Sequence, residues 1–231
     1  MVEVFVQDKT FKLVPVSDRD FVKQISSNAF VVALDLDGVI TSPYALKAKY
    51  INELGYRIAP SQANYETCVN NLKIKIEDYD RATIKAFTER PNILQLQADF
   101  MYYFEKLKSL KDCKVFIVTS RIDNLLPHLE EYLAYHKIRV DGIINTRNEN
   151  KLEFLEKINA DMFVEDVPYR LVQIFKEKGS DRRIFEDCLF VLFRNVANES
   201  LANPDPSIVE ADNWADLHEI IVERYNSEGR A

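Results

Sequence analysis

The sequence has no long apolar run, few cysteines and little glycine. No apolar stretch approaches the roughly 20 residues that a helix needs to cross a bilayer, which argues against an integral membrane protein. The three cysteines (Cys68, Cys113 and Cys188) are an odd number without the spacing of a zinc site, so we expect reduced thiols. The charged N-terminus does not resemble a signal peptide. Together these absences predict a cytoplasmic protein.

An excess of positive charge is also missing. The formal net charge of −7 argues against a nucleic-acid polymer or an anionic membrane as the main partner. A small anionic substrate stays possible, because a metal ion and a few local cations can override the overall sign. The length of 231 residues suits one large domain, or one domain that carries an insertion.

The most informative stretch is residues 31–40, where an apolar run leads into Asp35, Leu36, Asp37 and Gly38. Such a run is typical of a buried parallel strand. Residues two apart leave a strand on the same face, so both carboxylates would point the same way. An Asp-Gly turn in solvent is the simplest alternative. A calcium loop of the EF-hand type is excluded, because its glycine would have to come two positions later.

The rest of the chain predicts a mostly parallel, three-layer α/β sheet with an inserted helical block. We expect a hairpin and a short helix in an N-terminal extension, and then three helices between residues 42 and 91. The second of these would start at Ser61 and place Leu72 on the same face as Tyr65. A long helix over 92–110 would return the chain to the sheet. The predicted core is therefore 1–41 (with 1–28 as the extension) and 92–231, and the block is 42–91. Further strands are expected at 115–118, 140–144, 162–164 and 189–193, with helices at 123–136, 151–158, 168–178 and from 214.

Polar residues gather where the predicted strands end. Beyond the first strand and its two aspartates, the second strand ends in Thr119 and Ser120, and the fourth ends in Glu165 and Asp166. Lys151 begins the helix after the third strand. Ligands of such sheets bind outside the carboxyl ends of the strands, so these side chains should meet. Each of them alone would more often be an ordinary surface or capping residue.

The chemistry of this set suits a phosphate ester. Clustered carboxylates repel one another unless a hard cation joins them, and Mg²⁺ held by Asp35 and Asp166 would do so. One aspartate could then attack phosphorus, while the other protonates the leaving oxygen and later activates water. Thr119 and Lys151 would donate hydrogen bonds to the phosphate oxygens.

These motifs, in this order, resemble those of the haloacid dehalogenase superfamily of phosphatases, over roughly residues 30–193. The resemblance implies Asp35 as the nucleophile and Asp37 as the general acid/base. It implies phosphate contacts from Thr119 and Lys151, with Ser120 and Arg121 beside them as further candidates for substrate binding. The implied Mg²⁺ ligands are Asp35, Asp166 and the main-chain carbonyl of Asp37, with Glu165 as an alternative to Asp166. The block 42–91 lies where members of the superfamily carry a helical cap that selects the substrate.

The resemblance implies a Mg²⁺-dependent phosphomonoester hydrolase with a small-molecule substrate. Asp37 argues against dehalogenating members, which lack this second aspartate. Residues 115–120 and the Trp214 segment are similar to 5'(3')-deoxyribonucleotidases, so a nucleoside monophosphate is the first substrate expected. A sugar phosphate or another small metabolite is the alternative. A binding or regulatory protein that has lost turnover is the third possibility, and the complete set of motif residues disfavours it.

Overall fold

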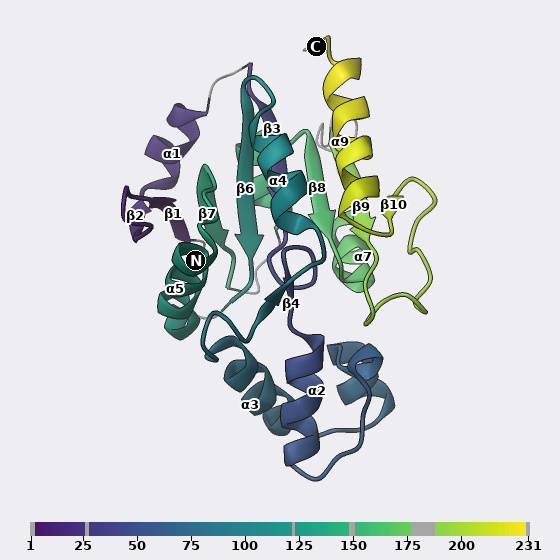
Figure 1. Ribbon diagram of the computed structural model, residues 1–231. Coiled ribbons are helices and arrows are strands. Elements are labelled where there is room, and N and C mark those ends of the chain that lie inside the picture. The colour runs from purple at the N-terminus through teal and green to yellow at the C-terminus, as the bar shows by residue number, and fades with distance from the viewer. Residues whose placement is uncertain (1–2, 26–27, 122, 148–150, 177–187, 230–231) are drawn as a thin grey trace.

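The computed structural model describes residues 3–25, 28–121, 123–147, 151–176 and 188–229. Its centre is an eight-stranded sheet with the strand order β10-β9-β8-β3-β6-β7-β1-β2 (Figure 1). Strands β10 to β7 in this order run parallel, and β1 and β2 add an antiparallel hairpin at one edge. The strands are β1 (Glu3–Gln7), β2 (Leu13–Val16), β3 (Phe30–Leu34), β6 (Cys113–Thr119), β7 (Gly142–Asn145), β8 (Met162–Glu165), β9 (Leu189–Phe193) and β10 (Val209–Ala211).

Strand β3 lies between β6 and β8, and all five of its residues are buried. Its side chains alternate between two apolar clusters on opposite faces of the sheet. Val32 and Leu34 belong to one cluster, whereas Val31 and Ala33 belong to the other. This explains the continuous apolar run in the sequence, because a strand covered on both faces has no polar side. The predicted buried parallel strand is confirmed.

Helices cover both faces of the sheet, as the three-layer prediction requires. Helices α4, α5 and α9 pack on the face of Val32, and α1, α6 and α7 pack on the opposite face. None of the helices in the described ranges has both the length and the apolar composition to cross a membrane. The helices are α1 (Asp18–Gln24), α4 (Phe100–Lys108), α5 (Leu126–His136) with the preceding 3₁₀ turn η3 (Asp123–Leu125), α6 (Leu152–Lys157), α7 (Pro168–Lys176) and α9 (Trp214–Ser227).

A helical block follows β3 and lies beyond the carboxyl ends of the strands (Figure 1). It contains α2 (Tyr44–Glu53), η1 (Pro60–Gln62), η2 (Glu66–Asn71) and α3 (Ile76–Phe87). Its apolar side chains form a cluster of their own, which includes Tyr50, Ile51 and Tyr79. The block therefore has a small core that is separate from the two faces of the sheet.

The middle of the block differs from its prediction. We expected one helix from Ser61 with Leu72 on its buried face, but the segment is a 3₁₀ turn followed by a short π-helix. Asn64 accepts a hydrogen bond from the Thr67 amide at 2.7 Å and so starts a new turn between them. Leu72 is 44% exposed, because its segment makes too little contact with the cluster to bury it.

The predicted long helix over 92–110 is also wrong in its first half. Residues Gln95–Leu96 form β5, which pairs antiparallel with β4 (Thr41–Ser42). Asp99 has a positive φ of 57°, so the helix begins only at Phe100. The spacing of the side chains favours a helix here, but the backbone of this segment pairs with β4 instead. The pairing joins the segment that enters the helical block to the segment that leaves it.

Asp141 ties helix α4 to strand β6 and provides a test of the fold. Its carboxylate accepts hydrogen bonds from Lys108 Nζ (2.5 Å), Lys114 Nζ (3.1 Å) and the Val115 amide (2.9 Å). Burial alone would raise its pKa, but the bonds from Lys108 and Val115 hold the pKa below the ordinary 3.8. A lowered pKa stabilises the fold above the unfolded-state value, and this contribution is lost as the pH falls through the folded-state value.

We therefore expect Asp141→Asn to lower the free energy of unfolding by about 1–2 kcal/mol near neutral pH. The difference from the wild type should shrink as the pH falls from 3.8 through the lower folded-state pKa, below which the carboxyl is neutral in both states. Urea denaturation at a series of pH values measures this. Asp112→Asn is the control, because Asn tolerates the positive φ of 53° at this exposed turn. Equal losses in the two variants would contradict the assignment.

Candidate active site

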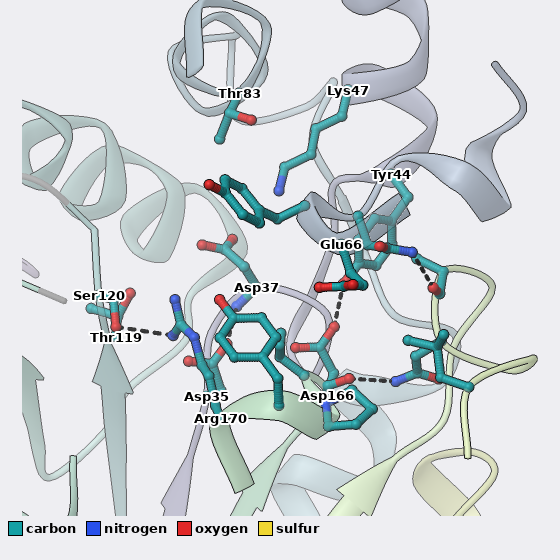
Figure 2. Close-up of a pocket in the computed structure, with 18 of the residues that line it drawn as sticks. Asp35, Asp37, Tyr44, Lys47, Glu66, Thr83, Thr119, Ser120, Asp166 and Arg170 are labelled. Carbon is teal, nitrogen blue, oxygen red and sulfur yellow. Dashed lines mark hydrogen bonds between the residues drawn. The ribbon is translucent and has the colours of Figure 1, made fainter. Parts of the chain in front are cut away.

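The candidate site lies at the carboxyl ends of β3, β6 and β8. After β3 the chain moves to β6 and β7 on one side, and it then crosses to β8 on the other side. This reversal opens a crevice at the end of β3, where ligands of parallel sheets bind. Asp35 follows β3, Thr119 ends β6 and Glu165 ends β8. Figure 2 shows that the side chains of this site and of the helical block face a common pocket.

Lys151 joins two of the carboxylates. Its Nζ donates to Asp35 Oδ1 and, at 2.7 Å, to Glu165 Oε2. All three side chains are buried, with no more than 6% of any of them exposed. The other oxygen of Asp35 accepts the Asp37 amide at 3.0 Å, which fixes the orientation of the carboxylate. The residue that begins helix α6 therefore reaches the end of the central strand, as the sequence predicted.

Asp166 is held from a different side. Its Oδ2 accepts hydrogen bonds from the hydroxyl of Tyr44, on helix α2, and from Asn195 Nδ2 at 2.9 Å. Its main-chain carbonyl accepts Asn198 Nδ2 at 2.6 Å. Its Oδ1 is buried and has no hydrogen-bond partner in the described part of the chain. Neither asparagine has a signal in the sequence, because both belong to the irregular loop after β9.

The acidic cluster fits a divalent metal ion. Asp35, Glu165 and Asp166 each offer a carboxylate oxygen, and these atoms lie within 4.8 Å of one another. A buried carboxylate oxygen without a donor is costly, and Asp166 of this cluster has such an oxygen, Oδ1, in the described part of the chain. Oxygen ligands of this kind are those that Mg²⁺ prefers. Asp35, Glu165 and Asp166 are therefore the residues that would hold such an ion. The sequence analysis expected Asp35, Asp166 and the Asp37 carbonyl, with Glu165 as the alternative to Asp166, and this choice of ligands stays a prediction.

The pKa values reflect the crowding of negative charge. Burial and the neighbouring Glu165 raise the pKa of Asp35 to about 6, against the opposing effect of Lys151. Burial, Glu165 and Asp35 raise the pKa of Asp166 well above 3.8. Burial also favours neutral Glu165, but Lys151 and Arg170 hold the pKa of that carboxyl below 4.5. Lys151 and Arg170 offset part of the negative charge of the three carboxylates, and a bound divalent cation would offset more of it.

Asp37 has a different environment from Asp35. Arg121 binds it with two hydrogen bonds, Nε to Oδ2 at 3.1 Å and Nη2 to Oδ1 at 2.7 Å. Thr41 Oγ1 also donates to Oδ1, at 2.9 Å. Burial would raise the pKa of Asp37, but Arg121 holds it below 3.8. The guanidinium lies over the ring of Phe87 at 4.2 Å, so helix α3 helps to position it. In this structure the Arg121 guanidinium therefore pairs with Asp37, and its predicted contact with a substrate stays a prediction.

The predicted phosphate-binding residues also reach the pocket. Thr119, Ser120 and Lys151 line it, together with Arg170 of helix α7. Arg170 Nη1 donates to Ser120 Oγ at 2.9 Å, and Glu165 and Asp35 raise the pKa of this arginine against the effect of burial. The sequence analysis missed Arg170, although its place on the first turn after the fourth motif was a usable signal.

The pocket has a volume of about 1090 Å³ and is walled on its far side by the helical block. Tyr44 and Tyr65 line it, as two of the block residues that could meet a substrate. Arg57 and Arg81 are exposed and do not line it; Arg81 instead pairs with Asp78 at 2.9 Å.

Comparisons with solved structures identify the fold. A predicted phosphoglycolate phosphatase from Haemophilus somnus has 15% sequence identity and a TM-score of 0.56, over 84% of this chain and 99% of that one. A haloacid dehalogenase-like protein from Agrobacterium tumefaciens has 10% identity and a TM-score of 0.59, over 85% and 99%. The chain has the fold of the haloacid dehalogenase superfamily. A β-phosphoglucomutase from Clostridium difficile (16% identity, TM-score 0.51, 87% and 98% covered) shares this fold.

No protein-family model matches the chain, and no curated protein matches it in sequence. The resemblance to the haloacid dehalogenase superfamily therefore rests on short motifs and on the fold. The structure brings the predicted site residues together, while their catalytic roles stay predictions.

Gly38 is required where the loop after β3 passes the acidic cluster. It has a positive φ of 102°, and an added Cβ would lie 1.9 Å from Asp166 Oδ2 and 2.7 Å from the Tyr44 hydroxyl. Gly55 has a similar φ of 97°, yet an added Cβ would meet nothing within 4 Å. Alanine substitutions at the two glycines can therefore be compared. Both introduce backbone strain, but only the substitution at Gly38 also displaces Asp166.

We expect Gly38→Ala and Gly55→Ala each to lose about 1–2 kcal/mol of stability from the positive φ, and Gly38→Ala to lose more from the clash. Only Gly38→Ala should weaken Mg²⁺ binding, by at least about tenfold, because it moves a carboxylate of the cluster. Thermal denaturation and calorimetric titration with Mg²⁺ measure the two effects. Unchanged Mg²⁺ affinity in a folded Gly38→Ala variant would contradict this placement of the ion.

Proposed function

We propose that this chain is a Mg²⁺-dependent phosphomonoester hydrolase that works through a phosphoryl-aspartate on Asp35. One observation carries the proposal: Asp35 lines the pocket, is held by Lys151, and belongs to an acidic cluster that fits a metal ion. A carboxylate in this position can act as a nucleophile once its charge is offset. When bound, Mg²⁺ would offset the charge of the cluster and of the phosphoryl group.

The first half of the reaction forms a bond between an Asp35 oxygen and phosphorus, and it breaks the bond from phosphorus to the leaving oxygen. Lys151, Thr119 and Ser120 stand where they can contact the phosphoryl oxygens. Protonated Asp37 gives its proton to the leaving oxygen and becomes a carboxylate. In the second half, Asp37 takes a proton from the water that attacks phosphorus, which regenerates free Asp35.

Arg121 favours one of the two protonation states of Asp37. Its two hydrogen bonds stabilise the carboxylate, which is the form that accepts a proton from water. The acid form requires this contact to loosen, and a phosphoryl group that attracts Arg121 would loosen it. Arg121 thereby links the arrival of the phosphoryl group to proton uptake by Asp37.

We further propose that residues 42–91 act as a cap over this site. Three contacts support the proposal. Tyr44 donates to Asp166, Phe87 stacks on Arg121, and Asn64 Nδ2 donates to the Ala197 carbonyl at 2.7 Å. The paired β4 and β5 join the two connections of the block at its base.

A nucleoside monophosphate is the first substrate to test. The pocket is large, and aromatic residues of the block (Tyr65, Tyr79 and Phe87) line it, which suits a flat base. A sugar phosphate is the alternative, and the β-phosphoglucomutase with the same fold acts in that chemistry. A panel of both classes, assayed with Mg²⁺, distinguishes them by kcat/KM.

Asp35→Asn tests the nucleophile. We expect the loss of the phosphoryl-enzyme and a fall in kcat of more than about 1,000-fold, because an amide cannot form the intermediate. Hydrolysis of p-nitrophenyl phosphate with Mg²⁺, and trapping of the acyl phosphate with hydroxylamine, measure these losses. Chelation with EDTA should abolish wild-type turnover, and added Mg²⁺ should restore it. A wild type that neither hydrolyses esters nor binds Mg²⁺ would favour a binding protein with this fold.

Asp37→Asn tests the proton transfer. For alkyl phosphates we expect phosphorylation of Asp35 to slow by about 100-fold or more, because the leaving alkoxide needs a proton. The burst of p-nitrophenolate should persist, because this leaving group departs without help. Rapid-quench measurement of the two substrate classes makes the comparison. Equal losses on both classes would assign Asp37 to a structural role.

A further inference from the structure

Lys47 is a buried cation of the helical block that the proposed reaction does not use. It lies on α2 and is only 8% exposed, yet it lines the pocket. Figure 2 shows its side chain extending from the helix toward the region of Asp37. Its charge acts on Asp37, for which it is one of the groups that lower the pKa. The ammonium therefore faces the same space as the proposed catalytic acids.

The surroundings of Lys47 are apolar. Its Nζ lies 5.7 Å from the ring centre of Tyr44, 5.7 Å from that of Tyr79 and 5.1 Å from that of Phe87. Three aromatic faces offset part of the cost of burying a cation. They do not replace the hydrogen-bond acceptors that an ammonium has in water, and a buried charge without an anion remains costly.

The other pocket cations have polar partners. Lys151 donates to Asp35 and Glu165, Arg121 donates to Asp37, and Arg170 donates to Ser120. By contrast, the ammonium group of Lys47 forms no ion pair or hydrogen bond with any residue that the structure describes, and its recorded contacts are with three aromatic rings.

Three acids that line the same pocket do not pair with Lys47. Asp37 is bound by Arg121, and Glu66 accepts a hydrogen bond from Asn70 at 2.7 Å. Asp80 is exposed to solvent. The ammonium of Lys47 therefore faces the pocket without an ion pair to any described residue.

The position of Lys47 indicates which part of a ligand it would meet. In the proposed reaction Asp35 attacks the phosphoryl group, and Asp37 gives its proton to the leaving oxygen. A cation on the far side of Asp37, in the wall formed by the helical block, lies on the side of the leaving group. We propose that Lys47 binds a second anionic group of the substrate, a carboxylate or a second phosphate carried by the leaving group. This inference rests on the proposed hydrolase activity and narrows its substrate class.

This inference changes the order of the expected substrates, because the sequence analysis placed nucleoside monophosphates first and sugar phosphates second. The leaving groups of nucleoside monophosphates and simple sugar phosphates are uncharged, so they would leave Lys47 unpaired. A phosphorylated hydroxy acid or a bisphosphate would pair with it. Binding energy from this remote contact would favour the anionic substrates in kcat/KM.

Three small esters test this preference. Phosphoglycolate and ethylene glycol bisphosphate carry the second anion, as a carboxylate and as a phosphate, and ethyl phosphate carries a methyl group in its place. We expect wild-type kcat/KM to be at least about tenfold higher for one anionic ester than for ethyl phosphate, since a hydrogen bond to a charged group contributes this much. The better of the two anionic esters identifies the group that Lys47 recognises.

Variants of Lys47 test whether this residue causes the preference for anionic esters. Lys47→Met keeps the apolar stem among the rings and should abolish the preference, mainly through KM, with less than about threefold change for ethyl phosphate. Lys47→Arg should restore part of it. Lys49→Gln is the matched control, because Lys49 lies two residues along the same helix but is exposed. This control should keep the full preference.

Two outcomes overturn the inference. One is a wild type that hydrolyses all three esters equally, a result that does not depend on any variant folding. The other is an equal loss on all three in Lys47→Met, which would assign Lys47 to tuning Asp37 or to packing. Calorimetric binding of the esters to the Asp35→Asn variant with Mg²⁺ reads the same preference without turnover. An absence of hydrolysis would thus refute the proposed activity alone, and the binding data would still decide the role of Lys47.

Discussion

The structure depends on the contact between Lys151 and two carboxylates at the end of the central strand. Asp35 and Glu165 are brought together because β3 and β8 are neighbours, and they would repel each other without a cation between them. Lys151 and Arg170 are the cations that act on these two carboxylates, and Asp166 adds a third carboxylate beside them. Three carboxylates against two cations leave an excess of negative charge in the cluster, which a bound metal ion would offset.

The two aspartates of the first strand show how environment separates chemical roles. They are two residues apart, yet burial beside Glu165 raises the pKa of Asp35, whereas Arg121 lowers that of Asp37. The difference comes from neighbours that arrive from other strands. The haloacid dehalogenase fold supplies the strand ends, and the particular side chains on them set the chemistry.

The sequence predicted the core of this arrangement well. A strand covered on both faces leaves a continuous apolar run, and strand ends concentrate polar residues, so β3 and the residues around Asp35 were visible. The sequence did not reveal where α4 starts. The pairing of β5 with β4 is a contact between segments far apart in the chain, and the spacing of apolar side chains carries no sign of it. Lys47 was missed for a similar reason, since a lysine on an amphipathic helix is usually exposed. Only the folded structure shows the three rings around it.

The last helix has a consequence for how the molecule is made. Trp214 Nε1 donates at 2.8 Å to the carbonyl of Val39, across 175 residues of sequence, and the ring packs at 4.9 Å from Phe100. The loop that carries Asp37 and Gly38 is thus fastened by a residue that a ribosome adds long after the loop itself. The two aspartates after β3 are therefore made well before this hydrogen bond can form. A nascent chain that is still short of α9 would lack the contact that holds the Val39 carbonyl in place.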